Sequence, residues 1–283
     1  MGKFDGMLLC TDLDGTLLRN DKSISPENRA AIDYFKREGG YFTFVTGRMP
    51  SYVWDMYRTV QPNAPVGCVN GGGLYDYENE RYLWTHGLSR DVMELVDYVD
   101  THMPTMGIQL NTFDTVYFCK ESSALSDFRA ETGVPNIVCP YREVPDPIAK
   151  ILFADRDGDE ITRLAALLSA HPRAGEFDFI RSDLTLYEIL PRGIHKGVSL
   201  SKLSEILGID PRRTVAVGDY DNDIGMLRTA GLGVAVANAT EAVKAAADMI
   251  TVSNEQHAIA AVIDHIEKNG LPTPRGASNC EKM

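Results

Sequence analysis

The chain has 283 residues, which is enough for one large domain or two smaller ones with an ample core. Its net charge of −12 and its pI of about 5.0 argue against general binding to nucleic acid. No apolar run reaches about eighteen residues and no signal pattern opens the chain, so we expect no membrane span and a cytoplasmic location. Five cysteines without paired spacing fit free thiols: Cys10, Cys68, Cys119, Cys139 and Cys280.

The first predicted element is a strand followed by two acids. Residues 7–10 are an apolar run, typical of a strand that is buried on both faces. Asp12 and Asp14 follow at its carboxyl end, where ligands bind in open α/β sheets. Asp12 can act there as a nucleophile or metal ligand, and Asp14 as a general acid and base. The alternative is an ordinary turn, because Asp-x-Asp-Gly is also common turn chemistry.

A helix and a second strand come next. Ser25 precedes a proline and is a typical N-cap for a helix that two glycines end. Residues 41–45 then predict a strand that ends in Thr46, Gly47 and Arg48. The Thr46 hydroxyl and nearby backbone N–H groups can donate to a phosphoryl oxygen. Outside this context, a helix cap would be the simpler interpretation of Thr-Gly-Arg.

A third strand is predicted over residues 65–69, after a helix over residues 51–60. Asn70 and three glycines follow it, and glycine permits tight turning and close backbone approach. Asn70 either contacts a substrate or caps the turn, and the residues alone do not decide between the two. Residues 74–77 and 81–84 predict a hairpin.

The pattern changes at about residue 85. Helices are predicted from Ser89 onward, over 122–132 with Gly133 as the stop, and over 160–169; strands are predicted over 107–112, 115–119, 149–154, 177–181 and 185–190. Hairpins and antiparallel pairing mark this stretch as α+β, whereas the flanking blocks alternate strand and helix. We therefore predict an α/β fold, with a Rossmann-like parallel-sheet core over residues 1–84 and 191–283. An inserted α+β domain is predicted over residues 85–190.

Lys196 begins a predicted helix that runs to Leu207. A lysine in the first helical turn is poorly placed for the helix dipole, which slightly favours a functional role over a surface charge. Without other motifs, a solvated lysine would be the default interpretation.

A second acidic cluster follows a short buried strand over residues 214–217. Its members suit a hard cation that is bound by oxygen atoms: Asp219, Asp221, Asn222 and Asp223. A polar turn is the alternative, while an EF-hand is disfavoured because its glycine and terminal glutamate are absent. The remaining chain predicts alternating strands and helices, which completes the core.

Four segments together resemble the motifs of the haloacid dehalogenase superfamily of phosphohydrolases. They are the Asp-x-Asp-Gly-Thr stretch at Asp12, the strand-terminal Thr46, Lys196, and the acidic cluster that begins at Asp219. Each lies at the carboxyl end of a predicted strand or the start of a helix, in the family's order. The insertion resembles the type IIB cap of Cof-like phosphatases.

The resemblance implies a mechanism and a cofactor. Asp12 would form an aspartyl phosphate, and Asp14 would protonate the leaving alcohol and then deprotonate water. Mg²⁺ would be held by the Asp12 carboxylate, the Asp14 backbone carbonyl and Asp219, with Asp223 and Asn222 orienting water, metal ligands or Lys196. The phosphoryl group would contact Thr46, Gly47, Arg48, Asn70, Lys196 and Asn222. Asp221 occupies a variable position of the motif and is expected to face solvent.

The functional hypothesis is a Mg²⁺-dependent phosphatase of small phosphorylated metabolites, with sugar phosphates as one possibility. A phosphomutase is an alternative, because it shares the nucleophile, acid and metal but keeps water from the aspartyl phosphate. A phosphate-sensing module without turnover is a second alternative, disfavoured because receiver domains are much shorter and lack the insertion. The partner expected is a small metabolite rather than nucleic acid or membrane. The sequence gives no indication of substrate identity or oligomeric state.

Overall fold

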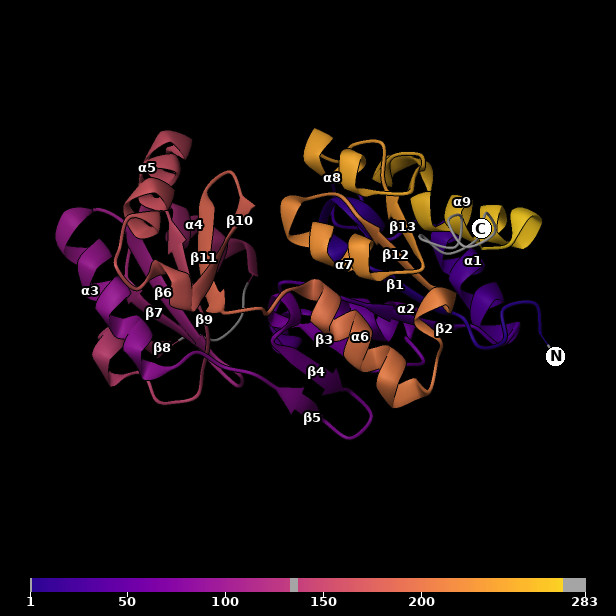
Figure 1. Ribbon diagram of the computed structural model, residues 1–283, viewed down its shortest axis with the longest axis horizontal. Coiled ribbons are helices and arrows are strands. Elements are labelled where there is room, and N and C mark those ends of the chain that lie inside the picture. The colour runs from indigo at the N-terminus through magenta and orange to yellow at the C-terminus, as the bar shows by residue number, and fades with distance from the viewer. Residues whose placement is uncertain (1, 133–136, 272–283) are drawn as a thin grey trace, which may run out of the picture. The chain divides into compact units, whose positions relative to one another are not determined.

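The computed structural model describes residues 2–132 and 137–271, which form two compact units (Figure 1). The core unit contains Met1–Thr46, Asp55–Leu83 and His195–Met283, and the inserted unit contains Gly47–Trp54 and Trp84–Ile194. The domain limits predicted above concern independent folding and stay a prediction. Gly133, the predicted stop of a helix, lies outside the described residues.

The core unit is organised around a parallel five-stranded sheet in the order β14-β13-β12-β1-β2. Its strands are β1 (Leu8–Thr11), β2 (Tyr41–Phe44), β12 (Thr214–Gly218), β13 (Leu232–Ala235) and β14 (Met249–Ile250). Strands β1 and β12 are buried along their whole length, as the continuous apolar runs predicted. They are neighbours with Thr11 opposite Val217, so the acids that follow the two strands emerge side by side.

Helices of the core unit flank this sheet. They are α1 (Pro26–Arg37), α2 (Trp54–Val60), α6 (Lys196–Leu207), α7 (Ile224–Thr229), α8 (Glu241–Ala246) and α9 (Ala258–Asn269). Helix α1 packs against α9, and α6 packs against α7 (Figure 1). Ser25 caps α1 as predicted, because its side chain accepts a hydrogen bond from the Asn28 amide.

The predicted third strand of the core is β3 (Val66–Cys68), but it does not extend the parallel sheet. It pairs with β4 (Gly73–Asp76), which lies beside β5 (Arg81–Thr85) in a separate three-stranded sheet. An isolated parallel bridge between Val45 and Gly67 lies between β3 and the end of β2. The chain reverses after β3 because Val69 and Asn70 both adopt positive φ, at 55° and 51°. A valine in this region is strained, and sequence patterns do not predict such a residue.

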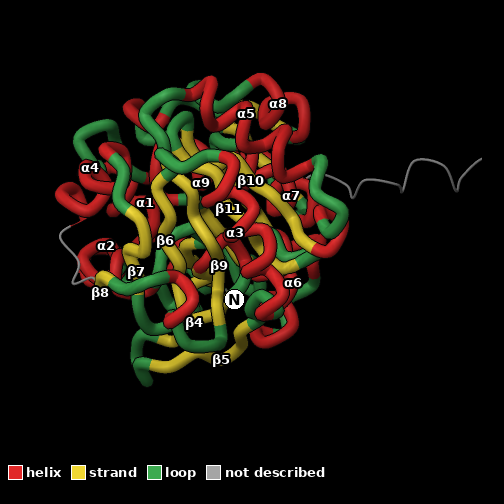
Figure 2. Tube along the Cα trace, turned by 90° about the vertical axis from the view of Figure 1, so that its left-hand side faces the viewer, coloured by secondary structure: helices red, strands yellow, loops and turns green. Residues whose placement is uncertain are grey.

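The inserted unit contains a six-stranded sheet in the order β10-β11-β9-β6-β7-β8. Its strands are β6 (Gly107–Thr112), β7 (Val116–Lys120), β8 (Ile137–Val138), β9 (Ile148–Ala154), β10 (Phe177–Asp183) and β11 (Leu186–Pro191), and its helices are α3 (Met93–His102), α4 (Ser123–Thr132) and α5 (Gly158–Ser169). Helices α3 and α5 contribute to one apolar core with one face of this sheet (Figure 2). The predicted fold class, a parallel-sheet core with an inserted α+β region, is confirmed. Strand β8 was not predicted, because two exposed residues carry no periodic signal.

Candidate active site

Asp12 stands at the point where β1 ends and the chain turns. Its amide donates to the carbonyl of Val217 at 2.9 Å, which continues the pairing with β12 by one residue. Residues Leu13–Leu17 then wind into a single tight turn in which Gly15 has φ +71°. A Cβ at Gly15 would lie 2.3 Å from Oδ2 of Asp219, so the glycine makes room for that carboxylate as well as for the turn.

Lys196 is almost fully buried, with 1% of its side chain exposed. Its Nζ donates to Oδ1 of Asp12 at 2.7 Å and to Oδ1 of Asp223 at 2.6 Å. The first turn of α6 therefore directs an ammonium group at two carboxylates from distant parts of the chain. His195 caps the same helix, because its Nδ1 accepts a hydrogen bond from the Gly197 amide at 3.1 Å.

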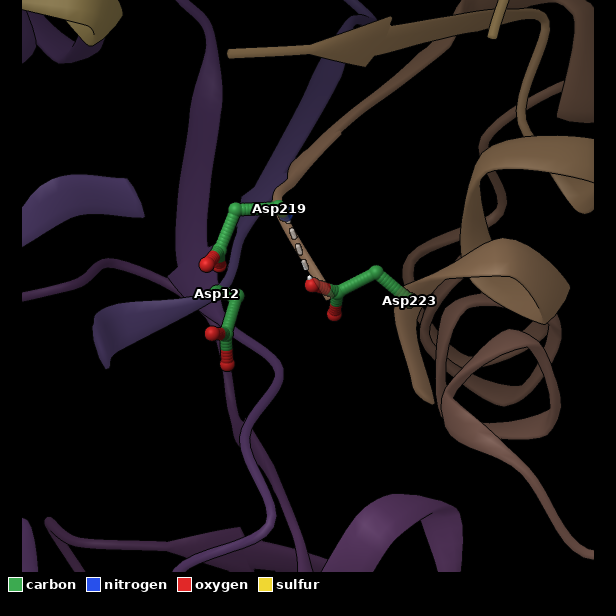
Figure 3. Close-up of side chains that lie close together, drawn as sticks. All are labelled: Asp12, Asp219 and Asp223. Carbon is green, nitrogen blue, oxygen red and sulfur yellow. Dashed lines mark hydrogen bonds between the residues drawn. The ribbon is translucent and has the colours of Figure 1, made fainter. Parts of the chain in front are cut away.

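The acids after β12 are fixed by the backbone and by one hydroxyl. Oδ2 of Asp223 accepts from the amides of Asp219 and Tyr220, at 2.9 and 3.2 Å. The Thr16 hydroxyl donates to Oδ1 of Asp219 at 2.7 Å. Figure 3 shows the side chains of Asp12, Asp219 and Asp223 close together, with the bond from the Asp219 amide to Asp223 dashed. The sequence patterns predict no role for Thr16, although a hydroxyl directly after two acids is a signal that could have indicated one.

These three acids fit a hard divalent cation. One carboxylate oxygen from each of Asp12, Asp219 and Asp223 lies within 4.8 Å of the others. All donors are oxygen, as Mg²⁺ prefers, and three carboxylates exceed the single positive charge of Lys196. The Asp14 carboxylate is not a member of this group. It is 41% exposed and pairs with Lys22 at 2.9 Å, while the predicted contribution of its backbone carbonyl stays a prediction.

The pKa shifts within the cluster also favour a bound cation. Burial raises the pKa of Asp12 well above its ordinary range, although Lys196 opposes the shift. Burial also raises the pKa of Asp219, to about 7, and the nearby Asp223 adds to it. Burial alone would lower the pKa of Lys196, but Asp12 and Asp223 outweigh it and raise that pKa. The lysine is thus the charged partner, and the surplus of carboxylates is what a cation would neutralise.

A chain of hydrogen bonds connects three other predicted site residues. Nδ2 of Asn222 donates to Oδ1 of Asn70 at 3.1 Å. The Asn70 amide in turn donates to the carbonyl of Thr46 at 3.1 Å, and the Thr46 amide donates to Gly67. Asn70 is fully buried within the strained turn after β3, which places its side chain beside the acidic turn.

The remaining predicted residues have different surroundings. Gly47 and Arg48 belong to the inserted unit, where Nη1 of Arg48 donates to the carbonyl of Tyr52 at 3.3 Å. Asp221 is exposed, as expected, and accepts a hydrogen bond from the Thr240 hydroxyl. The structure therefore brings together Asp12, Lys196, Asp219 and Asp223, with Thr46, Asn70 and Asn222 linked by hydrogen bonds of their own.

Comparison with known proteins identifies the class. The family described as haloacid dehalogenase-like hydrolase matches residues 9–263. The chain belongs to this family and is an enzyme of the hydrolase class.

Particular relatives share nearly the full length. Two 5-amino-6-(5-phospho-D-ribitylamino)uracil phosphatases of Bacillus subtilis (strain 168), YitU and YcsE, are 29% and 30% identical. YitU matches over 89% of this chain and 94% of its own length, and YcsE over 92% and 96%. The solved structure of BT4131 is described as a subclass IIB sugar phosphatase. It superposes on this chain with a TM-score of 0.82 at 18% identity, and the match covers 92% of this chain and 98% of that one. The two proteins therefore share the fold. Within residues 2–132 and 137–271, no helix combines the length and apolarity needed to cross a bilayer.

Proposed function

We propose that the protein is a Mg²⁺-dependent phosphatase that hydrolyses phosphate monoesters of small metabolites through an aspartyl phosphate on Asp12. The observation that carries the proposal is the buried contact of Lys196 with both Asp12 and Asp223 beside Asp219. A lysine held this way neutralises the nucleophile, and the three clustered carboxylates still carry more negative charge than it balances, which suits a cation. The phosphatase names of YitU and YcsE, which span nearly this whole chain, support the same activity.

The first half of the reaction forms a bond between Asp12 and phosphorus. An Asp12 oxygen attacks the phosphorus atom, the bond from phosphorus to the ester oxygen breaks, and that oxygen receives a proton from Asp14. Lys196 stays on the Asp12 carboxylate and balances charge as the phosphoryl group arrives. Thr46 donates its hydroxyl to a phosphoryl oxygen, and Asn70 and Asn222 hold the adjacent turn.

The second half restores the enzyme. Asp14, now a carboxylate, takes a proton from water; the water oxygen attacks phosphorus, and the Asp12–phosphorus bond breaks to release phosphate. The surface pair of Asp14 with Lys22 is exposed and hence weak, so it leaves Asp14 able to exchange protons. Asp12, Asp219, Asp223 and the Asp14 carbonyl would hold Mg²⁺, which would supply positive charge that offsets the negative charge of the nucleophile and the phosphoryl group.

The names of the relatives support a substrate class. The names of YitU and YcsE specify a phosphorylated ribityl group, so we propose a phosphate ester of a polyhydroxylated small molecule, with sugar phosphates included. The four described cysteines are free thiols, which is consistent with a reducing cytoplasm.

The test is phosphate release from a panel of sugar, polyol and cofactor phosphates, with Mg²⁺ and with EDTA. We expect Mg²⁺-dependent turnover that Asp12→Asn lowers by about 10⁴-fold or more, because the amide is a poor nucleophile. Asp221→Asn is the matched control: it removes an exposed acid two residues from Asp219 and should leave turnover near the wild-type rate. Full turnover by Asp12→Asn, or turnover unaffected by EDTA, would contradict the proposal.

A further inference from the structure

The sheet of the inserted unit has two faces of different character. The face that carries Ile151 and Ile189 joins the apolar core with α3 and α5. On the opposite face, Lys150 of β9 and Glu188 of β11 form an ion pair at 2.9 Å, with only 6% and 3% of their side chains exposed. Two buried amides of β6, Gln109 and Asn111, share this face, and Asn111 lies directly opposite Lys150.

A buried ion pair is an unfavourable way to fill the interior beside a sheet, because both charges lose their hydration. Removing two charges from water costs several kcal/mol per ion, and apolar residues of similar volume often serve stability equally well or better. The other six residues of β9 are apolar, so Lys150 is the exception in a strand that is buried throughout. The pair therefore indicates a need for a charge at this point beyond packing.

The hydrogen bonds of Lys150 indicate what the buried charge is for. Its Nζ donates to the backbone carbonyl of Gly47 at 3.1 Å, as well as to Oε2 of Glu188. Gly47 begins the short segment Gly47–Trp54, which belongs to the inserted unit although it lies far from it in sequence. The same segment is held again where the ring of Tyr52 meets that of Phe128 edge-on, at 6.3 Å between centroids.

On its N-terminal side, Gly47 is joined to Thr46, which is a residue of the candidate active site. Thr46 belongs to the core unit, and its amide and carbonyl are fixed by Gly67 and Asn70. The Thr46–Gly47 peptide thus joins a residue held by the core unit to one held by Lys150. The Gly47 carbonyl belongs to the next peptide, so only the φ and ψ angles of Gly47 lie between it and the planar Thr46–Gly47 peptide. Because glycine has wide conformational freedom, fixing its carbonyl restricts the path of the chain that leaves Thr46 and thereby helps to hold the Thr46 side chain in one direction.

We propose that Lys150 is a positioning residue for the phosphatase reaction. Its ammonium group, fixed by Glu188, holds the Gly47 carbonyl and thereby orients the Thr46 hydroxyl toward the phosphoryl group. This inference rests on the proposed function of Thr46. It assigns the buried pair to alignment of the phosphate-binding loop rather than to contact with the leaving group.

The test uses a double variant, Lys150→Met with Glu188→Leu, which removes both charges and leaves neither unpaired. We expect kcat/KM to fall by about 10- to 100-fold, the loss typical of a catalytic group displaced by about 1 Å, while Tm stays near the wild-type value. The loss should be equal for acetyl phosphate, p-nitrophenyl phosphate and a sugar phosphate. Lys120→Met with Asp100→Leu is the control, because it removes an ion pair of the same unit whose lysine binds Asp100 and not the Gly47 carbonyl.

A double-mutant cycle separates positioning from a merely structural role. When Thr46→Val already lacks the hydroxyl, removing the Lys150–Glu188 pair should cost less than about threefold more, since the pair acts through that hydroxyl. Independent, multiplying losses would overturn the proposal. So would a loss confined to the sugar phosphate, which would instead place the pair against the leaving group. If the apolar variant fails to fold, Lys150→Gln with Glu188→Gln takes its place.

Hydrogen exchange is a second measurement, and it does not depend on enzyme activity. We expect hydrogen exchange at the amides of residues 47–49 to be at least about tenfold faster in the double variant than in the wild type, because the segment loses an anchor. Unchanged exchange would contradict the anchoring. A wild type that hydrolyses none of these esters would refute the proposed function, whereas the exchange result would still decide whether Lys150 anchors Gly47.

Discussion

At the scale of single residues, the candidate site depends on small side chains as much as on charged ones. Gly15 lets the chain turn with positive φ and leaves space that Oδ2 of Asp219 occupies. Lys196 reaches Asp12 and Asp223 only because α6 begins at that residue. The acids and the lysine were predictable from their motif positions, whereas the contact between Gly15 and Asp219 joins residues some two hundred positions apart.

Replacing Gly15 by alanine tests that contact. A Cβ would meet the Asp219 carboxylate at 2.3 Å and would force a left-handed residue, at a cost of about 1–2 kcal/mol in stability. Because Asp219 must move, we expect kcat/KM on p-nitrophenyl phosphate to fall by about tenfold or more. Gly208→Ala is matched, since Gly208 has φ +65° and nothing within 4 Å of the added methyl. It should lose similar stability and keep its activity; equal activity in both variants would contradict the argument.

At the scale of elements, sequence patterns predicted the limits of a helix or strand correctly where local chemistry determines them. The predicted limits of α6 and β6 match the structure, because Gly208 ends the helix and residues 107–112 form an uninterrupted buried strand. The third predicted strand is present as β3, but it pairs with β4 rather than extending the parallel sheet. Its pairing depends on the positive φ of Val69, a conformation that valine disfavours and that no local pattern announces.

The cap of α1 gives an element-scale prediction. Oγ of Ser25 accepts a hydrogen bond from the Asn28 amide at 3.2 Å, and that amide lies in the first turn of the helix. We expect Ser25→Ala to lower the free energy of unfolding by about 1 kcal/mol, measured by urea denaturation of the core transition. Ser201→Ala should change stability in the opposite direction or not at all, because Ser201 is exposed inside α6, where alanine is the better helix former. Equal destabilisation by both would contradict a capping role.

At the scale of the whole molecule, the chain crosses between its two units inside a proposed phosphate-binding motif. The sequence predicted an insertion from residue 85, where the pattern of elements changes. It did not predict that Gly47–Trp54 belongs to the inserted unit, because that association depends on Lys150 and Phe128, which are remote in sequence. Motif matching places Thr46, Gly47 and Arg48 in one functional group, whereas the structure divides the three between two units.

Cation binding should also be measurable as stability of the molecule. Without a divalent ion, Lys196 is the cation that bonds this cluster, and burial together with repulsion among the carboxylates raises the pKa values of Asp12 and Asp219. A ligand that binds only the folded state stabilises it by RT ln(1 + [L]/Kd), which is about 2.7 kcal/mol at one hundred times Kd. We therefore expect Mg²⁺ to raise Tm by several degrees over EDTA in the wild type.

Asp219→Asn should be more stable than the wild type in EDTA, because it removes one of the repelling charges, and should gain little from Mg²⁺. Asp221→Asn should keep the full Mg²⁺ shift. If Mg²⁺ raises Tm equally in all three proteins, the ion binds elsewhere, and the acidic cluster is not the metal site.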